Sequence, residues 1–367
     1  MHTTRRFLFA ALCAAPATLA QSQLPLPAQA NDVDGHHSLS MPFGVPGFRT
    51  QILIDADAIA PVGAVLNGIR FRADRGSAPQ AAVVVPNVTV TLSHNSLGFG
   101  GLQPVFANNV TGATTPVFTG AVTLPAQVES FAGPTGWDIV VQFAQPYTFT
   151  SAQGDLLIDI VGNNPASQPA EYWLDALQGG GSSTIYGRAG DDPSFDFLNL
   201  VVSTNGFLDP RLLSPGRTIE FSSLQSFTQP PGFLALGFDG LPVPFDLGQI
   251  GAPTNAVYMT PVATVPHSWQ QSFIGWYSTA AVPIPNDPAF VGLRLYGQSF
   301  TFSPAANALG LLSSAAAEVR IGDALEVFPM QQVDADDPAA TTGVVVDFGF
   351  PNPEWGAVAL LLEGIFF

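Results

Sequence analysis

Glycine and proline are so frequent in this chain that long helices are excluded. The 367 residues include 36 glycines and 33 prolines, together nearly one residue in five. Proline lacks the amide proton that a helix interior needs and glycine weakens a helix, whereas both residues are common in turns. Apolar residues make up 47% of the chain and charged residues only 11%, which favours a buried core over disorder. The composition therefore predicts a folded protein of short strands joined by turns.

The segments between these turns alternate in the way that strands do. Ile69 and Phe71 alternate with Arg70 and Arg72, so one face is apolar and the other is expected to face water. The same period of two, or a run rich in β-branched and aromatic residues, predicts further strands at 83–85, 88–92, 116–124, 139–143, 156–160, 198–203, 218–221, 233–238, 256–260, 271–278, 291–302, 317–321, 344–348 and 355–362.

Turn clusters separate these strands at short, regular intervals, which is typical of a sandwich and not of βαβ units. The proline-rich segment Gln229–Gly232 interrupts the pattern and predicts a domain boundary. We therefore expect an all-β fold of two tandem antiparallel β-sandwich domains, jelly-roll or immunoglobulin-like, at 38–226 and 227–367. The second is expected to include the C-terminal strands, because the apolar run Trp355–Phe367 contains Glu363 and is shorter than a membrane-spanning helix.

The first 20 residues read as a signal peptide. Arg5 and Arg6 supply a positive start, Phe7–Ala15 an apolar stretch, and Thr18–Ala20 a small-residue cleavage site. A second cleavage site follows Ala30, and the arginine pair leaves both general secretion and twin-arginine export open. Residues 21–37 are rich in Gln, Pro and Ala and are expected to be a linker. The predicted location is secreted, either extracellular or at the cell surface.

The charge balance excludes several classes of partner. The chain has no lysine, and loss of Arg5 and Arg6 with the leader leaves nine arginines against 28 acidic residues, a net charge of −19. Nucleic acid and anionic membranes need a basic surface, so neither is an expected partner. Cys13 is the single cysteine and lies in the leader, so the mature chain has no disulfide and no thiol nucleophile.

Two parts of the chain carry motifs that resemble those of exported bacterial proteins. The motifs are Leu66–Arg72, Phe106–Val110, Trp137–Val141 and Gly154–Asp159 in the first part, roughly 38–226, and Gly240–Gly248, Gly251–Pro253 and Pro283–Ala289 in the second, roughly 230–322. The first part resembles uncharacterised secreted bacterial β-sandwich proteins, some of which end in exosortase sorting tags. The second resembles a module that recurs at the ends of large bacterial secreted proteins.

The resemblance implies an extracellular β-sandwich protein and supplies no catalytic residue. The chain departs from these relatives at Thr254 and Asn255, where many of them carry a cysteine after the Gly-Ala-Pro turn. It also departs at Pro353–Trp355, which no spanning helix and basic tail follow.

Three acidic turns are candidate calcium sites, because closely spaced aspartates on a loop begin to supply the six or more oxygens that calcium needs. None matches the full EF-hand loop, and solvated turn residues are the alternative. Calcium is the one cofactor that the sequence suggests. The three turns contain Asp32, Asp34 and Gly35; Asp191, Asp192 and Asp196; and Asp334, Asp336 and Asp337.

No catalytic motif stands out. His94 and His267 could each serve a serine nucleophile, but the chain has no G-x-S-x-G motif, and the adjacent His36 and His37 make a poor metal site on a linker. Glu171 and Asp175, four residues apart on an expected strand, share a face with Trp173. Two carboxylates beside an aromatic ring are what a glycosidase uses, so a sugar site is one interpretation of this segment and a structural edge strand is the other.

Aromatic residues give the main binding hypothesis. His267 and four rings, Trp269, Phe273, Trp276 and Tyr277, lie within eleven residues among Ser and Gln. Such rings stack on sugars or bind a protein partner. On one straight strand the two tryptophans would point to opposite faces, so one is expected in the core and one at a recognition surface.

The predicted function is that of a secreted, non-catalytic structural, surface or matrix-binding protein, whose partner is an extracellular glycan or a surface protein. The alternative is a carbohydrate-binding module or weak polysaccharide hydrolase. A concave site lined by carboxylates would favour the hydrolase, and a polar or aromatic site without them would favour binding.

Overall fold

A computed structural model confirms a mostly-β protein. It describes residues 22–31, 34–35, 37–75, 81–98, 100–127, 134–163, 172–177, 181–190, 198–204, 213–225, 228–272, 275–322, 329–346 and 357–367. Within these ranges the single α-helix is α1, the four residues Ala56–Ile59, and all strand pairs of the named sheets are antiparallel. The short helix agrees with the glycine and proline content. The expected signal peptide lies outside the described residues.

The strands fall into two groups by their pairing, and the first group combines residues 22–177 with the last strands of the chain. One sheet has the order β1 (Ser22–Leu26), β24 (Leu360–Phe366), β4 (Gly63–Phe71), β7 (Ile139–Thr150). A second has the order β22 (Val344–Val345), β21 (Met330–Ala335), β3 (Gly47–Ile54), β8 (Asp155–Asn163), β5 (Val83–Asn95), β6 (Thr115–Leu124). A third, small sheet has the order β2 (His37–Leu39), β9 (Leu174–Leu177), β23 (Ala357–Val358).

The first two of these sheets pack across one apolar core. Ile69 and Phe71 of β4 and Ile158 and Ile160 of β8 are fully buried in the same cluster. The alternation in the sequence therefore identified the inward faces correctly. It was wrong for Arg72, expected to face water, which is only 1% exposed because it pairs with a buried aspartate.

The second group contains the strands of residues 182–320. One sheet has the order β10 (Ser182–Tyr186), β20 (Leu311–Arg320), β19 (Arg294–Phe302), β13 (Gly232–Gly237), β16 (Ala263–Pro266). The other has the order β11 (Leu198–Thr204), β12 (Thr218–Gln225), β18 (Gly275–Pro283), β17 (Gln270–Ser272). A separate ribbon pairs β14 (Asp239–Asp246) with β15 (Ala256–Thr260).

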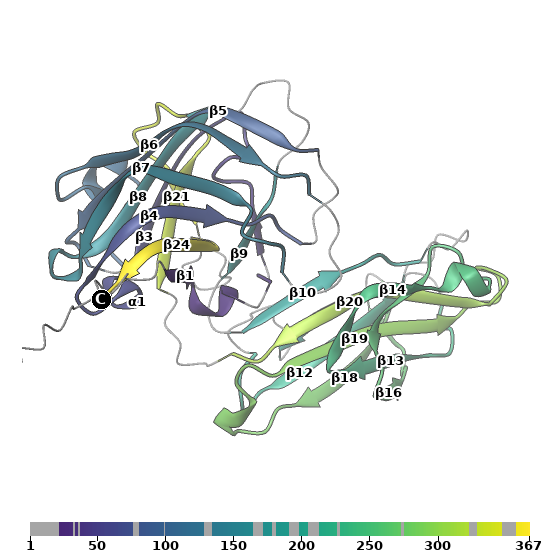
Figure 1. Cartoon of the computed structure of the whole chain (residues 1–367). Helices are drawn as coiled ribbons and strands as arrows, with labels where there is room; N and C mark the ends of the chain where they lie inside the picture. Colours follow the sequence, from purple (N-terminus) through teal and green to yellow (C-terminus); the bar gives the residue numbers. More distant parts are fainter. Residues whose placement is uncertain are drawn as a thin grey trace, which may run out of the picture.

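Two clusters of buried residues hold the second group together. Phe221 of β12, Leu234 of β13 and Val319 of β20 belong to the cluster that the two larger sheets share. A second cluster includes Tyr258 and Met259 of β15 together with residues of β10, β19 and β20, so the ribbon packs on the same sheet. In Figure 1 the green strands of this group are set apart from the purple, blue and yellow strands of the first.

This pairing differs from the predicted division at 226–232. Strands β10 and β12 precede that point but pair with β20 and β18, which follow it, and β11 pairs with β12 in the same sheet. The residues of β21, β23 and β24 were expected in the second domain, 227–367, but these strands pair with β3, β9 and β4. Figure 1 shows yellow β24 beside purple β1 and blue β4. The sequence carries no signal for such distant pairing, because the backbone N–H and C=O groups of a strand can pair equally well with those of any other apolar strand.

The predicted linker at 21–37 also differs from the structure. Ser22–Leu26 forms β1, which pairs with β24 along its whole length, and Leu26 is 2% exposed. His37 begins β2. Apolar Leu24 and Leu26 pack against the first core, which the Gln- and Pro-rich composition of this segment conceals.

Candidate functional site

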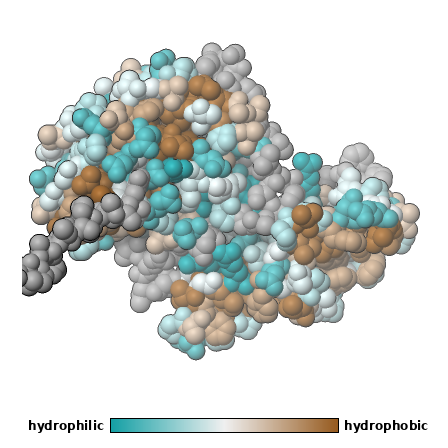
Figure 2. All heavy atoms as spheres, in the orientation of Figure 1, coloured by the Kyte–Doolittle hydropathy of each residue, from teal (hydrophilic) through white to brown (hydrophobic). Residues whose placement is uncertain are grey.

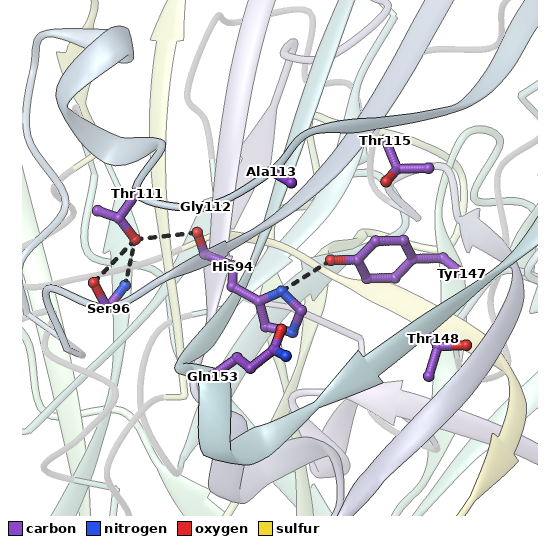
Figure 3. Close-up of a pocket in the computed structure, with 9 residues that line it drawn as sticks. All are labelled: His94, Ser96, Thr111, Gly112, Ala113, Thr115, Tyr147, Thr148 and Gln153. Carbon is purple, nitrogen blue, oxygen red and sulfur yellow. Dashed lines mark hydrogen bonds between the residues drawn. The ribbon is translucent and has the colours of Figure 1, made fainter.

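A pocket of about 310 Å³ opens in the first strand group, beside His94. Its walls come from the end of β5, the segment before and at the start of β6, the end of β7 and the turn after it. Figure 3 shows the side chains that line it. They are His94, Ser96, Thr111, Gly112, Ala113, Thr115, Tyr147, Thr148 and Gln153.

His94 is held by contacts on both ring nitrogens. Its Nδ1 lies 3.1 Å from the Tyr147 hydroxyl, and the Thr150 backbone N–H donates to Nε2 at 3.3 Å. The imidazole stacks on Phe149 with ring centroids 5.3 Å apart. Burial lowers the pKa of His94, so the ring is neutral at neutral pH. These contacts fix the ring in one orientation at the pocket wall.

The pocket is polar but carries no charged side chain. Three threonines, one serine, one glutamine, one tyrosine and a neutral histidine supply its polar groups. Burial raises the pKa of Tyr147 to about 12, so its hydroxyl keeps its proton at neutral pH. In Figure 3, Thr115 and Thr148 lie on either side of Tyr147, and Gln153 lies next to His94. Such a lining hydrogen-bonds uncharged polar groups and contains no carboxylate.

The predicted aromatic cluster is split by a chain reversal. Gln270–Ser272 is β17 and Trp276 lies in β18, and the two strands pair with each other, so the assumed single straight strand is wrong. Both tryptophans are half-buried, and Trp269 Nε1 donates to the Pro230 carbonyl at 2.7 Å. Tyr277 is half-buried as well, and Phe273 lies outside the described residues. The prediction that one tryptophan alone serves recognition stays a prediction.

Only one of the two proposed carboxylates, Asp175, lies among the described residues, and it is buried in the interior. Asp175 is fully buried in β9, and both its oxygens are engaged, one by Arg72 and one by the Gly35 backbone N–H at 2.7 Å. Trp173 is half-buried next to it, while Glu171 lies outside the described residues. Because Asp175 is already paired with Arg72, it is not available as a free acid or base. Its contacts instead stabilise the fold.

Of the predicted calcium turns, one is fully described. Asp334 accepts hydrogen bonds from the Thr50 hydroxyl at 2.7 Å and from the Gln332 amide, and burial raises its pKa to about 7. Asp337 caps a turn by accepting from the Ala339 N–H, and Asp336 is exposed. In the described part of the chain, no three His, Cys, Asp or Glu side chains come together to hold a metal. Outside that part lie Asp32, Asp191, Asp192 and Asp196.

A cluster of buried charges lies where the two strand groups meet; we call it the charged junction. It consists of Asp34, Arg72, Arg75, Asp175 and Glu318. Arg72 pairs with Asp175 and donates to the Ala30 carbonyl at 2.6 Å, and Arg75 pairs with Glu318 of β20 at 2.7 Å. Arg75 also lies over the Tyr186 ring of β10, 4.2 Å from its centroid. Since Arg75 follows β4, these contacts join the first group to the second.

Asp34 is the unusual member of the charged junction. It is 1% exposed, and neither carboxylate oxygen has a hydrogen-bond partner among the described residues. Burial, followed by the charges of Asp175 and Asp74, raises the pKa of Asp34 well above its ordinary value, and Arg75 and Arg72 oppose that rise. A buried, unpaired carboxylate is costly, so the protonated acid is the favoured form.

The second strand group has a polar interior at one end. His267 Nε2 lies 3.2 Å from the Ser223 hydroxyl and 3.0 Å from the Ser299 hydroxyl, so it bridges the two sheets. The Trp269 ring meets the imidazole edge-to-face at 4.7 Å. Burial lowers the pKa of His267 to about 4. Ser223 and Ser299 are 1% and 0% exposed, so neither can reach a substrate as a nucleophile.

Large apolar side chains are exposed on and near the ribbon of the second group. Phe238, Val243, Phe245, Ile250 and Val262 are each about half exposed or more, with Val243 at 77%. Figure 2 shows brown, apolar surface over this part of the molecule. Within the described residues no helix has the length and apolar character to cross a membrane.

Comparisons with known proteins add no identification: no family, curated protein or solved structure matches this chain.

The sequence singled out His94 only as a histidine that could serve a serine, and it missed the pocket. The residues that form the pocket come from four separate parts of the chain, and none of them belongs to a motif. These parts are 94–96, 111–115, 147–148 and 153. Adjacent small polar residues in Thr111–Thr115 are a weak signal, because such residues are equally common in turns.

Proposed function

We propose that this chain is a secreted, non-catalytic binding protein, built of β-sandwich domains, in which the pocket beside His94 binds a small uncharged polar ligand. One observation carries the proposal: all polar groups that line the pocket are uncharged hydrogen-bonding groups. Its volume of about 310 Å³ is at the lower end of small-molecule sites, which suits a single sugar unit of an extracellular glycan.

Secretion and a place at the cell surface or in a matrix follow from the N-terminal pattern and from the resemblance to exported bacterial proteins. The acidic composition fits a soluble extracellular protein. The exposed apolar side chains near the ribbon support a protein contact in addition to the glycan, because exposed apolar patches mark interaction surfaces.

The hydrolase alternative is less well supported. Hydrolysis of a glycosidic bond needs two carboxyl groups beside the sugar, and the pocket lining contains none. Asp175, one of the two carboxylates that the sequence suggested, is buried against Arg72. We therefore expect no release of reducing ends from polysaccharides incubated with the protein, and sustained release would overturn the non-catalytic assignment.

The binding proposal is tested by titrating the secreted chain with neutral methyl glycosides and following the backbone amide signals of the pocket by NMR. We expect shifts at Thr111, Gly112 and Thr148 with at least one glycoside. Ala113→Trp places a large ring at the exposed pocket wall and should abolish these shifts. Ala289→Trp makes the same change at an exposed position of the second group and should not. Absence of shifts with every glycoside, or equal loss in both variants, would refute the pocket as the site.

A further inference from the structure

The hydrogen bonds of His94 determine which of its nitrogens carries the proton. The Thr150 backbone N–H donates to Nε2, so Nε2 must offer a lone pair. A neutral imidazole has one protonated nitrogen, which leaves the proton on Nδ1. The tautomer is therefore assigned by the hydrogen-bond network, as is usual for histidine.

This tautomer fixes the role of the Tyr147 hydroxyl. Nδ1–H lies 3.1 Å from the Tyr147 oxygen and can only donate to it. The phenol proton cannot point back at this donor, so it is directed elsewhere. Tyr147 has no other hydrogen bond among the described residues, and it is one of the residues that line the pocket. The hydroxyl is thus left with one unused donor at the pocket wall.

The other polar groups of the pocket are not constrained in this way. Threonine and serine hydroxyls rotate and can donate or accept, and an amide offers both roles. Thr111 is already engaged by the Ser96 N–H at 2.8 Å and by the His94 carbonyl at 3.3 Å. Among the described lining residues, only the Tyr147 hydroxyl has its donor role fixed in this way: His94 Nδ1–H donates to its oxygen, and the Thr150 backbone N–H fixes the protonation of His94.

We propose that Tyr147 is the specificity-determining residue of this site and donates a hydrogen bond to a hydroxyl, ether or carbonyl oxygen of the ligand. The inference rests on the proposed function and names the ligand class more closely: a neutral polyol such as an unmodified sugar. An ammonium group at the same position has no lone pair to accept the bond, so a protonated amino sugar is excluded there.

The tautomer can be tested without any ligand. Long-range proton–nitrogen NMR correlations of the full secreted chain distinguish a protonated from an unprotonated ring nitrogen. We expect Nδ1 of His94 to be protonated and Nε2 unprotonated near neutral pH. The reverse tautomer would overturn the inference while leaving the pocket, and the proposed function, intact.

The donor role is tested with the methyl glycoside that gives the largest shifts and with the 2-amino and other amino analogues of that same sugar. Tyr147→Phe removes the donor and should weaken binding about five- to tenfold. Tyr172→Phe, which deletes a buried hydroxyl that donates to the Pro125 carbonyl, should leave the affinity unchanged. At least one amino analogue should bind as weakly as Tyr147→Phe binds the parent sugar.

The outcomes separate the two claims. Glycoside binding that Tyr147→Phe does not weaken would overturn the role of Tyr147 and keep the pocket as the site. Failure of every glycoside to bind the unmodified protein would overturn the proposed function and, with it, the ligand class.

Discussion

The two strand groups bury polar side chains in different ways. The charged junction at the edge of the first group contains whole ions, two arginines paired with Asp175 and Glu318, with Asp34 beside them. The interior of the second group instead contains neutral partners, with His267 between two serine hydroxyls. Transfer of an ion from water to the interior costs much free energy, and a buried ion is tolerated only when it is paired with an opposite charge. A buried neutral polar group needs only a hydrogen bond.

The difference predicts opposite responses to pH. Asp34 has a raised pKa in the folded state, so its contribution to stability is greatest in acid and falls as pH rises. His267 has a lowered pKa, so its contribution is greatest above about pH 6.5 and falls as pH drops. The same physical cause, burial, therefore acts on the two regions with opposite sign.

The largest effect is expected when a buried ion pair of the junction is broken. Asp175→Ala leaves the Arg72 guanidinium buried without its carboxylate, which should lower the free energy of unfolding by about 3–5 kcal/mol. Chemical denaturation measures the change. Asp159→Ala breaks the partly exposed pair with Arg49 at 2.7 Å and should cost only about 1–2 kcal/mol. Equal losses in the two variants would mean that the burial of the junction has no energetic consequence.

The next effect concerns the unpaired acid of the junction. Asp34→Asn keeps the shape but removes ionisation. Below pH 3.8 the variant and the parent should be equally stable, because the carboxyl is protonated in both folded and unfolded parent. As pH rises above 3.8, the unfolded parent loses its proton first, so the parent loses stability and the variant does not.

Denaturation at pH 3.5, 5 and 7 follows this difference, and Asp287→Asn, at an exposed turn cap where asparagine serves equally well, is the matched control. A stability gap that shrinks with rising pH would show that Asp34 is stabilised as an anion.

A smaller effect of opposite sign is expected in the second group. The unfolded His267 takes up a proton near pH 6.5, whereas the folded one does so near pH 4, so stability falls as pH drops through this window. After allowance for partial exposure, we expect a loss of about 1–2 kcal/mol between pH 7 and pH 4.5. His267→Gln keeps an acceptor for the Ser223 and Ser299 hydroxyls but cannot protonate. Its melting temperature should therefore fall less with acid than that of the parent; an identical fall would assign the acid sensitivity to other groups.

The sequence predicted most strands because burial imposes a period of two. Ile139 and Val141 of β7 and the whole of β15 lie where alternation and strand-forming residues placed them. Residues 271–278 were expected as one strand but belong to two, β17 and β18. The reversal was not predicted, because the local composition around it gives no strong turn signal.

Polar positions were the hardest to predict from sequence. Alternation placed Arg72 in water, since nothing near it shows that Asp175, 103 residues away, would neutralise it in the interior. The pocket was missed for the same reason: His94 and Tyr147 gain their roles from a contact between β5 and β7 that no local pattern encodes. The periodicity and composition of a segment indicate which face of a single strand is buried. The partners of a polar side chain depend instead on which distant strands pack against each other.

The smallest effect should come from the pocket, and it tests whether a polar group at an open site differs from one in the interior. Tyr147→Phe removes a hydroxyl that, among the described residues, has one hydrogen bond, accepted from His94 Nδ1 at 3.1 Å, and water that enters the open pocket can replace it. We expect its unfolding free energy to change by less than about 0.5 kcal/mol.

Tyr172→Phe is the matched deletion in the interior: that hydroxyl donates to the Pro125 carbonyl at 2.9 Å, and its residue is 2% exposed. Loss of that bond leaves a carbonyl without its donor, which should cost about 1–1.5 kcal/mol. The two variants delete the same atom from the same residue type in the same strand group, and both residues are largely buried, at 7% and 2% exposed. A difference between their melting curves therefore reports what surrounds each hydroxyl, an open pocket or the packed interior. Equal destabilisation would indicate that the Tyr147 hydroxyl serves the fold, and a binding role for it would then need support from the ligand titrations alone.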